Sequence, residues 1–106
     1  MIPKHPVKPQ RVRRIPNGFG WVDHRLARER LFMGLSHSSL ALYLLLISVS
    51  DGEGLSYWSD RTICETLDMT SSSLREATAE LEKADLVAYA APIFQILSIP
   101  VHEVAR

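Results

Sequence analysis

The stretch Ser59–Ala77, SDRTICETLDMTSSSLREA, decides the fold of this chain because it predicts two helices separated by a tight turn. Ile63 and Leu67 lie four residues apart, on one face of a short helix that Ser59 or Asp60 can cap and that ends near Leu67. Thr70 is a hydroxyl residue of the kind that caps a helix start. The inward positions of the longer helix that follows have the spacing i, i+3, i+4, i+7, and they are Leu74, Ala77, Thr78 and Leu81.

Downstream of this pair the hydrophobic period changes from that of a helix to that of a strand. Leu86–Tyr89 is expected to form one strand and Ile93–Ile99 a second, with the turn at Ala90–Pro92. The sequence therefore predicts a β-hairpin after the longer helix.

Upstream, two further helices are expected. Asp23 can cap a helix over Asp23–Met33, and Gly34 is a plausible left-handed stop. Ser36 precedes the apolar run Leu40–Ile47, whose nearly complete lack of a polar face predicts the central helix of the core or a dimer face. A short strand is expected at Leu55–Trp58, after the turn-forming residues Asp51, Gly52 and Gly54.

The resulting order of helices, short strand, helix-turn-helix and hairpin resembles the winged helix-turn-helix family. The resemblance rests on Ser59–Ala77 and on four residues that continue the pattern, namely Leu81, Ala84, Leu86 and Val87. A similar pattern occurs in small bacterial transcription regulators, in replication-initiation domains and in helix-turn-helix proteins of mobile elements. The resemblance implies an α+β, mainly helical winged helix-turn-helix domain over residues 18–106, in which the hairpin is the wing.

The same resemblance implies that the helix starting after Thr70 is the recognition helix that enters the DNA major groove. Its first turn offers hydroxyls and free backbone N–H groups to bases and phosphates. Arg75 is the one long donor that can contact guanine O6 and N7 together, and Arg61 on the preceding helix can hold a phosphate. The expected DNA-binding residues of this region are Arg61, Thr70, Ser71, Ser72, Ser73, Arg75 and Glu76.

Charge is distributed unevenly although the chain is formally neutral. Residues 1–30 contain eight Lys and Arg against two acidic residues, and residues 31–106 contain four against ten. Residues 1–17 are predicted to be a flexible arm, since they are rich in proline and poor in large apolar groups. Its cations are expected to supply electrostatic affinity for DNA, and they are Lys4, Lys8, Arg11, Arg13 and Arg14. Trp21 and Val22 are expected to dock onto the acidic body.

Composition excludes several classes of protein. A chain of 106 residues is too short for a two-domain enzyme, and its single cysteine, Cys64, allows neither an internal disulfide nor a thiolate metal cluster. The four histidines show no metal-ligand spacing. We therefore expect no catalytic residue, no metal ligand and no cofactor. The apolar run is too short for a membrane span and the basic N-terminus lacks a signal-peptide core, so a cytoplasmic location is expected.

The sequence thus predicts sequence-specific binding of double-stranded DNA. The role that the resemblance implies is transcription regulation or replication initiation, and a mobile element is one context for it. Because one recognition helix offers few base contacts, a homodimer or a larger protein assembly is also expected. An alternative stays open: Leu86–Ile99 contains no Lys or Arg, which favours a winged-helix module for protein interaction or oligomerisation that does not contact DNA. A third hypothesis is RNA binding by the arm alone.

Overall fold

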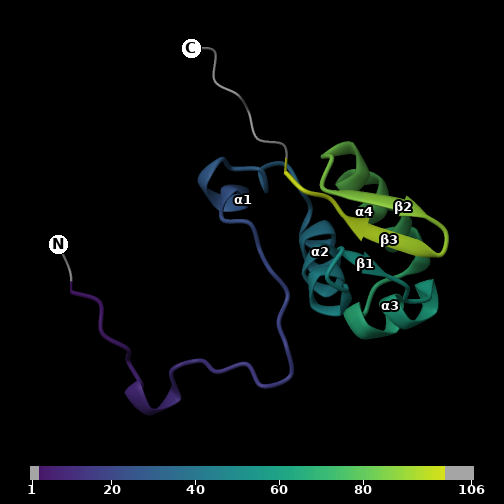
Figure 1. Cartoon of the computed structure of the whole chain (residues 1–106). Helices are drawn as coiled ribbons and strands as arrows, with labels where there is room; N and C mark the ends of the chain where they lie inside the picture. Colours follow the sequence, from purple (N-terminus) through teal and green to yellow (C-terminus); the bar gives the residue numbers. More distant parts are fainter. Residues whose placement is uncertain (1–2, 100–106) are drawn as a thin grey trace.

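The computed structural model describes residues 3–99 and consists of a small α+β domain preceded by an extended segment (Figure 1). All helices of the described residues precede the hairpin of a three-stranded antiparallel sheet, a layout compatible with a winged helix. The elements in chain order are η1 (Pro9–Arg11), α1 (Arg25–Arg28), α2 (His37–Val49), β1 (Leu55–Ser56), α3 (Asp60–Leu67), α4 (Ser71–Lys83), β2 (Val87–Ala90) and β3 (Ile93–Ile96). Residues 100–106, including His102, lie outside the described part.

Helix α2 is at the centre of the core, as its apolar run predicted. Leu42 and Leu46 are completely buried, and α2 packs mainly against α4. Ser36 caps the helix by accepting a hydrogen bond from the backbone N–H of Ser39. Leu44 nevertheless remains exposed, so α2 is not enclosed on all sides.

The two helices that the sequence predicted from Ser59–Ala77 are confirmed. Ser59 caps α3 by accepting from the N–H of Thr62, and Thr70 caps α4 by accepting from the N–H of Ser73. Between them, Asp68 takes a left-handed conformation with φ of 53° and turns the chain sharply. All four predicted inward positions of α4 are buried, and they are Leu74, Ala77, Thr78 and Leu81.

Strand β3 lies between β1 and β2 in the sheet. The hairpin register pairs Val87 with Ile96 and Ala90 with Ile93. The turn predicted at Ala90–Pro92 is therefore one residue shorter, since Ala90 belongs to β2 and only Ala91 and Pro92 form the tip. The first strand is shorter than predicted, because its ladder with β3 contains only Leu55 and Ser56 and not the following two residues.

The prediction for the first helix is wrong in length. A helix was expected over Asp23–Met33, but α1 ends at Arg28 because Arg30 takes a left-handed conformation with φ of 56°. The N–H of Leu31 then donates to the carbonyl of Leu26, which closes the helix end. Asp23 still accepts a hydrogen bond from the N–H of Arg25 at the helix start, and Gly34 is left-handed as expected.

Asp85 stands where a glycine is usual at the end of a helix, and it adopts the glycine-like conformation with φ of 61°. The N–H of Asp85 donates to the carbonyl of Glu82, and the N–H of Leu86 donates to the carbonyl of Leu81. These two bonds form a Schellman motif, so α4 ends in the ordinary way and the chain turns into the hairpin.

The segment before α1 does not dock through its aromatic side chains, contrary to the expectation from sequence. Trp21 is 82% exposed and Val22 is also exposed. Contact with the body is made by the backbone at Gly20, where an added Cβ would lie 2.5 Å from the carbonyl oxygen of Ile47. Only glycine allows this close approach, and the neighbouring side chains remain in solvent.

Candidate nucleic-acid interface

Helix α4 presents one exposed face along its whole length. Its inner face packs against α2 and α3, so its orientation is fixed by the core. The residues on the outer face are Ser71, Ser72, Arg75, Glu76, Ala79, Glu82 and Lys83. Hydroxyls and Arg75 occupy the N-terminal half, and two glutamates balance the two cations, so the face as a whole is formally neutral.

The N-terminal turn of α4 has hydrogen-bond donors that the helix itself does not use. The first intrahelical bond runs from the N–H of Leu74 to the carbonyl of Thr70. Thr70 Oγ1 accepts from the N–H of Ser73 at 3.0 Å. The N–H groups of Ser71 and Ser72 precede these bonds, and both residues are exposed. This turn is suited to an anionic or hydrogen-bond-accepting ligand.

Arg75 is exposed on the same face, one turn further along α4. Its guanidinium makes no ion pair or hydrogen bond with any residue in the described range 3–99. Neither Glu76 nor Glu82, the acidic neighbours on this face, binds it. A ligand can therefore use all of its donors without displacing an internal partner.

Arg61 has a partner. Its Nε lies 3.4 Å from Glu65 Oε2, one turn along α3, and its side chain is 87% exposed. An exposed pair of this geometry contributes at most about 0.5 kcal/mol and is screened by salt, so it can open when a phosphate competes.

Glu80 is acidic but does not belong to the outer face of α4. Its Oε1 accepts a hydrogen bond from the backbone N–H of Ser36, the residue that caps α2. This bond and a second with Ser39 hold the pKa of Glu80 below its ordinary value. In a capping box the residue three positions into the helix fills this role, but here that residue is Ser39, and a glutamate from another helix replaces it. Sequence spacing within α2 gave no signal of this contact.

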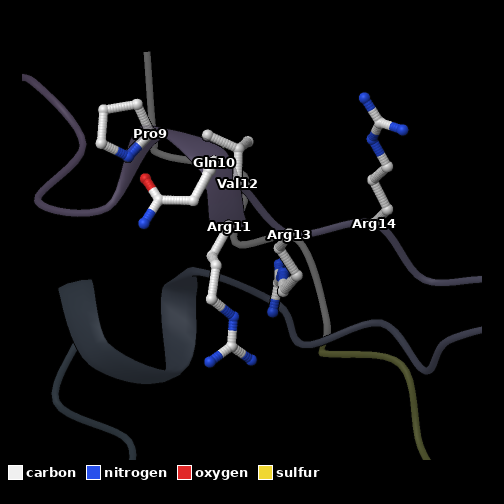
Figure 2. Close-up of a pocket in the computed structure, with 6 residues that line it drawn as sticks. All are labelled: Pro9, Gln10, Arg11, Val12, Arg13 and Arg14. Carbon is white, nitrogen blue, oxygen red and sulfur yellow. The ribbon is translucent and has the colours of Figure 1, made fainter.

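The N-terminal arm lies away from α4 and from the sheet (Figure 1). Every described residue from Pro3 to Gly20 is exposed. Figure 2 shows Arg11 and Arg13 extending to one side of the chain and Arg14 to the other, around a hollow that these residues form with Pro9, Gln10 and Val12 alone. The hollow is a bend of the arm, and the body does not contribute to it.

The predicted DNA-binding residues thus fall into two separate groups. One group lies on the helix pair, with Thr70–Glu76 on α4 and Arg61 on α3. The other group is the five cations of the arm, of which Lys4 and Lys8 precede η1. The structure does not bring the two groups together.

The hairpin has no charged side chain on its exposed positions. These positions are Ala88, Ala90, Ala91, Pro92, Ile93 and Gln95. Small and apolar side chains of this kind cannot clamp a phosphate backbone electrostatically.

Arg25 links the start of α1 to the segment that follows β3, a contact that the sequence pattern did not predict. Its guanidinium lies 2.7 Å from Asp23 Oδ2 and donates to the carbonyl of Ile99 at 2.9 Å. The hydrogen bond from Arg25 lowers the pKa of Asp23. Because the two residues joined to Arg25 are far apart in sequence, only the structure reveals the link.

Within residues 3–99, no three His, Cys, Asp or Glu side chains gather in an arrangement that would hold a metal ion. No helix in the same range is long and apolar enough to cross a bilayer. Comparison with protein-family models, with curated proteins and with solved structures gives no match to this chain.

Proposed function

We propose that this protein is a non-enzymatic, cytoplasmic winged helix-turn-helix protein that binds double-stranded DNA, with Thr70–Glu76 of α4 in the major groove. The observation that supports this most is the asymmetry of α4. Its inner face is fixed against α2 and α3, while the outer N-terminal half presents free N–H groups, hydroxyls and an arginine with no partner among the described residues. A recognition helix can place its side chains against the base edges of the major groove only when the rest of the domain fixes its orientation.

The strand order supports the same reading of the fold. The hairpin follows α4 directly, and β3 pairs with both β1 and β2. The short link between α3 and α4, with its left-handed Asp68, is suited to a helix-turn-helix. Transcription regulation or replication initiation, on a mobile element or elsewhere, is the role that the family resemblance implies.

We assign the nonspecific part of the affinity to the arm. The outer face of α4 is neutral and the hairpin has no cation, so neither can supply a strong attraction to phosphates. The arm contains five cations and all of them are exposed. In this proposal the arm binds the backbone and α4 contacts the bases.

A salt titration tests this division. The full chain is titrated onto mixed-sequence duplex DNA, with fluorescence anisotropy as the readout, over a series of salt concentrations. A variant with all five arm cations changed to Gln should show a log–log salt slope smaller by up to about 4.5, at about 0.9 per phosphate contact. Absence of binding by the full chain at low salt would refute the proposed function. An unchanged slope would remove the arm from the interface.

A second candidate is a winged-helix module that binds protein and not DNA. The observation that favours it is the uncharged hairpin, in which Ile93 is 36% exposed. In that case Ile93→Asp should change the oligomeric state, and an unaltered mass in light scattering would exclude the hairpin as an interface.

A further inference from the structure

A groove of about 650 Å³ lies where the segment Phe19–Trp21 crosses the end of α2. One wall is formed by the turn Asp51–Gly54, and another by Gln95–Ser98 at the end of β3. Ile47 contributes to the floor at the point where Gly20 approaches it. A volume of this size is in the range of protein ligand sites.

Two chemical features distinguish this groove from the rest of the surface. Phe19 and Trp21 line it, and they are 68% and 82% exposed, an unusual environment for side chains of this size. Asp51 and Glu53 also line it, and the lining contains no Lys or Arg. The groove is therefore aromatic and acidic.

The arm of the same chain has the complementary chemistry. Pro3, Pro6 and Pro9 recur at intervals of three, which is the period of a polyproline II helix. In the structure the segment bends at Val7–Lys8 and Pro9 begins η1, so the three rings come to lie along one edge when this turn extends on docking. Lys8, which precedes Pro9, has φ of −124° and ψ of 87° and is the residue at which the chain turns into η1. Proline-rich segments with this spacing dock in aromatic-lined grooves, because little conformational entropy is lost when they bind.

Charge favours the same pairing. Lys4, Lys8 and Arg11 lie on or next to the proline edge, and no acidic residue occurs before Asp23. Asp51 and Glu53 supply negative charge to the groove lining, although Asp51 Oδ1 also accepts hydrogen bonds from the N–H groups of Glu53 and Leu55 within the turn. DNA, by contrast, is repelled by this groove, so the groove is not part of the proposed DNA interface.

The groove is not filled by the arm of its own chain. The arm leaves the groove at Phe19, and every described residue from Pro3 to Gly18 is exposed. Figure 1 shows the arm running away from the domain. The aromatic walls are thus open to a second molecule.

We propose that residues Pro3–Arg11 of one copy dock in the groove of a second copy, so that two chains exchange arms in a dimer. The prolines pack against Phe19 and Trp21, and the arm cations pair with Asp51 and Glu53. In the exchanged dimer only Arg13 and Arg14 remain available to phosphate, so the arm contributes about 1.8 to the salt slope there, below the upper limit of about 4.5 that holds for an arm free of the groove. The exchange itself does not require DNA, so it stands independently of the proposed function.

Sedimentation equilibrium of the full chain without DNA tests the exchange. The wild-type chain should dimerise with concentration, and salt should weaken the dimer because exposed charges are screened. Trp21→Ala and the double change Pro6→Ala with Pro9→Ala should each raise the dimer dissociation constant by about tenfold or more, since aromatic anchors dominate interface energies. Matched controls are Tyr57→Ala, an exposed aromatic outside the groove, and Pro16→Ala, a proline outside the repeat, and both should dimerise like the wild type.

A mixing experiment makes the test specific to arm and groove. The Trp21→Ala chain keeps its arm, and the double proline variant keeps its groove, so an equimolar mixture should form a heterodimer through one intact contact. Each variant alone should remain largely monomeric at the same concentration. Circular dichroism should show unchanged folding, because both changes are at exposed positions.

Three results would overturn the proposal. A full chain that is monomeric at all concentrations would leave the groove to a different partner. If the dimer dissociation constant is unchanged by Trp21→Ala and by the double proline change, the dimer interface lies elsewhere, for example at the hairpin. A mixture of the two variants that contains no heterodimer would show that the arm does not bind in the groove. None of these results bears on binding of α4 to DNA.

Discussion

Replacing Arg75 by alanine removes the one long donor from the N-terminal half of the exposed α4 face. Arg75 makes no ion pair or hydrogen bond with residues 3–99, and its side chain is exposed. The free energy of unfolding should therefore change by no more than about 0.5 kcal/mol. Any loss of DNA affinity then reports a lost contact to DNA and not a damaged fold.

The size of the loss follows from the contact that is removed. If Arg75 donates to guanine O6 and N7, its removal should cost about 1–3 kcal/mol, which is about 5- to 150-fold in the dissociation constant. The loss should depend on the identity of one base pair. If Arg75 instead contacts a phosphate, all duplexes should be weakened alike and the salt slope should fall by about 0.9.

Fluorescence anisotropy with a set of duplexes that differ at single positions measures both quantities. Lys83→Ala is the matched control, because Lys83 is a cation on the same face but at the opposite end of α4. It should leave base discrimination unchanged. Equal affinity of wild type and Arg75→Ala for every duplex would refute the assignment of Arg75 to DNA recognition.

Three further predictions concern the scaffold that holds α4. Leu81 is completely buried, so Leu81→Ala should lower the free energy of unfolding in urea by about 2–5 kcal/mol, and a loss below 1 kcal/mol would contradict the core described. Asp85→Gly should stabilise the domain by about 0.5–1 kcal/mol, because Asp85 is left-handed, whereas Glu82→Gly within α4 should destabilise it by a similar amount; the same sign for both changes would refute the argument. The pKa of Glu80 is lowered from 4.5, so its carboxylate stabilises the fold above pH 4.5, and this contribution is lost as pH falls through the lower folded pKa. In Glu80→Gln, the free energy of unfolding measured in urea should therefore decrease less than in the wild type as the pH falls below 4.5. The same pH dependence in both proteins would show that the contact with Ser36 does not stabilise the fold.

The helix pair could be predicted from sequence because its signals are local. Ser59 and Thr70 are strong caps, and the spacing from Leu74 to Leu81 indicates a single buried face. The hairpin was also predicted, with each strand displaced or shortened by a few residues. Periodicity and capping depend on neighbours within one or two turns, which a sequence shows directly.

Features that depend on contacts between distant segments could not be predicted. The early end of α1 depends on the left-handed conformation of Arg30, a residue type that rarely adopts it. Glu80 binds the start of α2, a contact between two helices that the spacing within either helix does not show. Trp21 was expected to be buried because it is large and apolar, but the backbone of Gly20 occupies the contact instead.

The positions of the candidate residues on the helix pair were predicted, and their binding role remains a proposal. Residues Thr70–Glu76 do lie at the start of one helix, with Ser71, Ser72 and Arg75 exposed. The i, i+4 spacing of Arg61 and Glu65 on the predicted helix is a local signal of their ion pair that was not used. The separation of the arm from α4 depends on the path of the chain in space, which local sequence signals do not show.

Chemical-shift mapping by NMR tests the central claim most directly. The uniformly labelled full chain is titrated with duplex DNA while its backbone amide signals are followed. The proposal predicts that the largest shift changes occur in Thr70–Glu76, with smaller ones in the arm. Changes confined to the hairpin or to the arm, with the amides of α4 unmoved, would contradict recognition of DNA by α4.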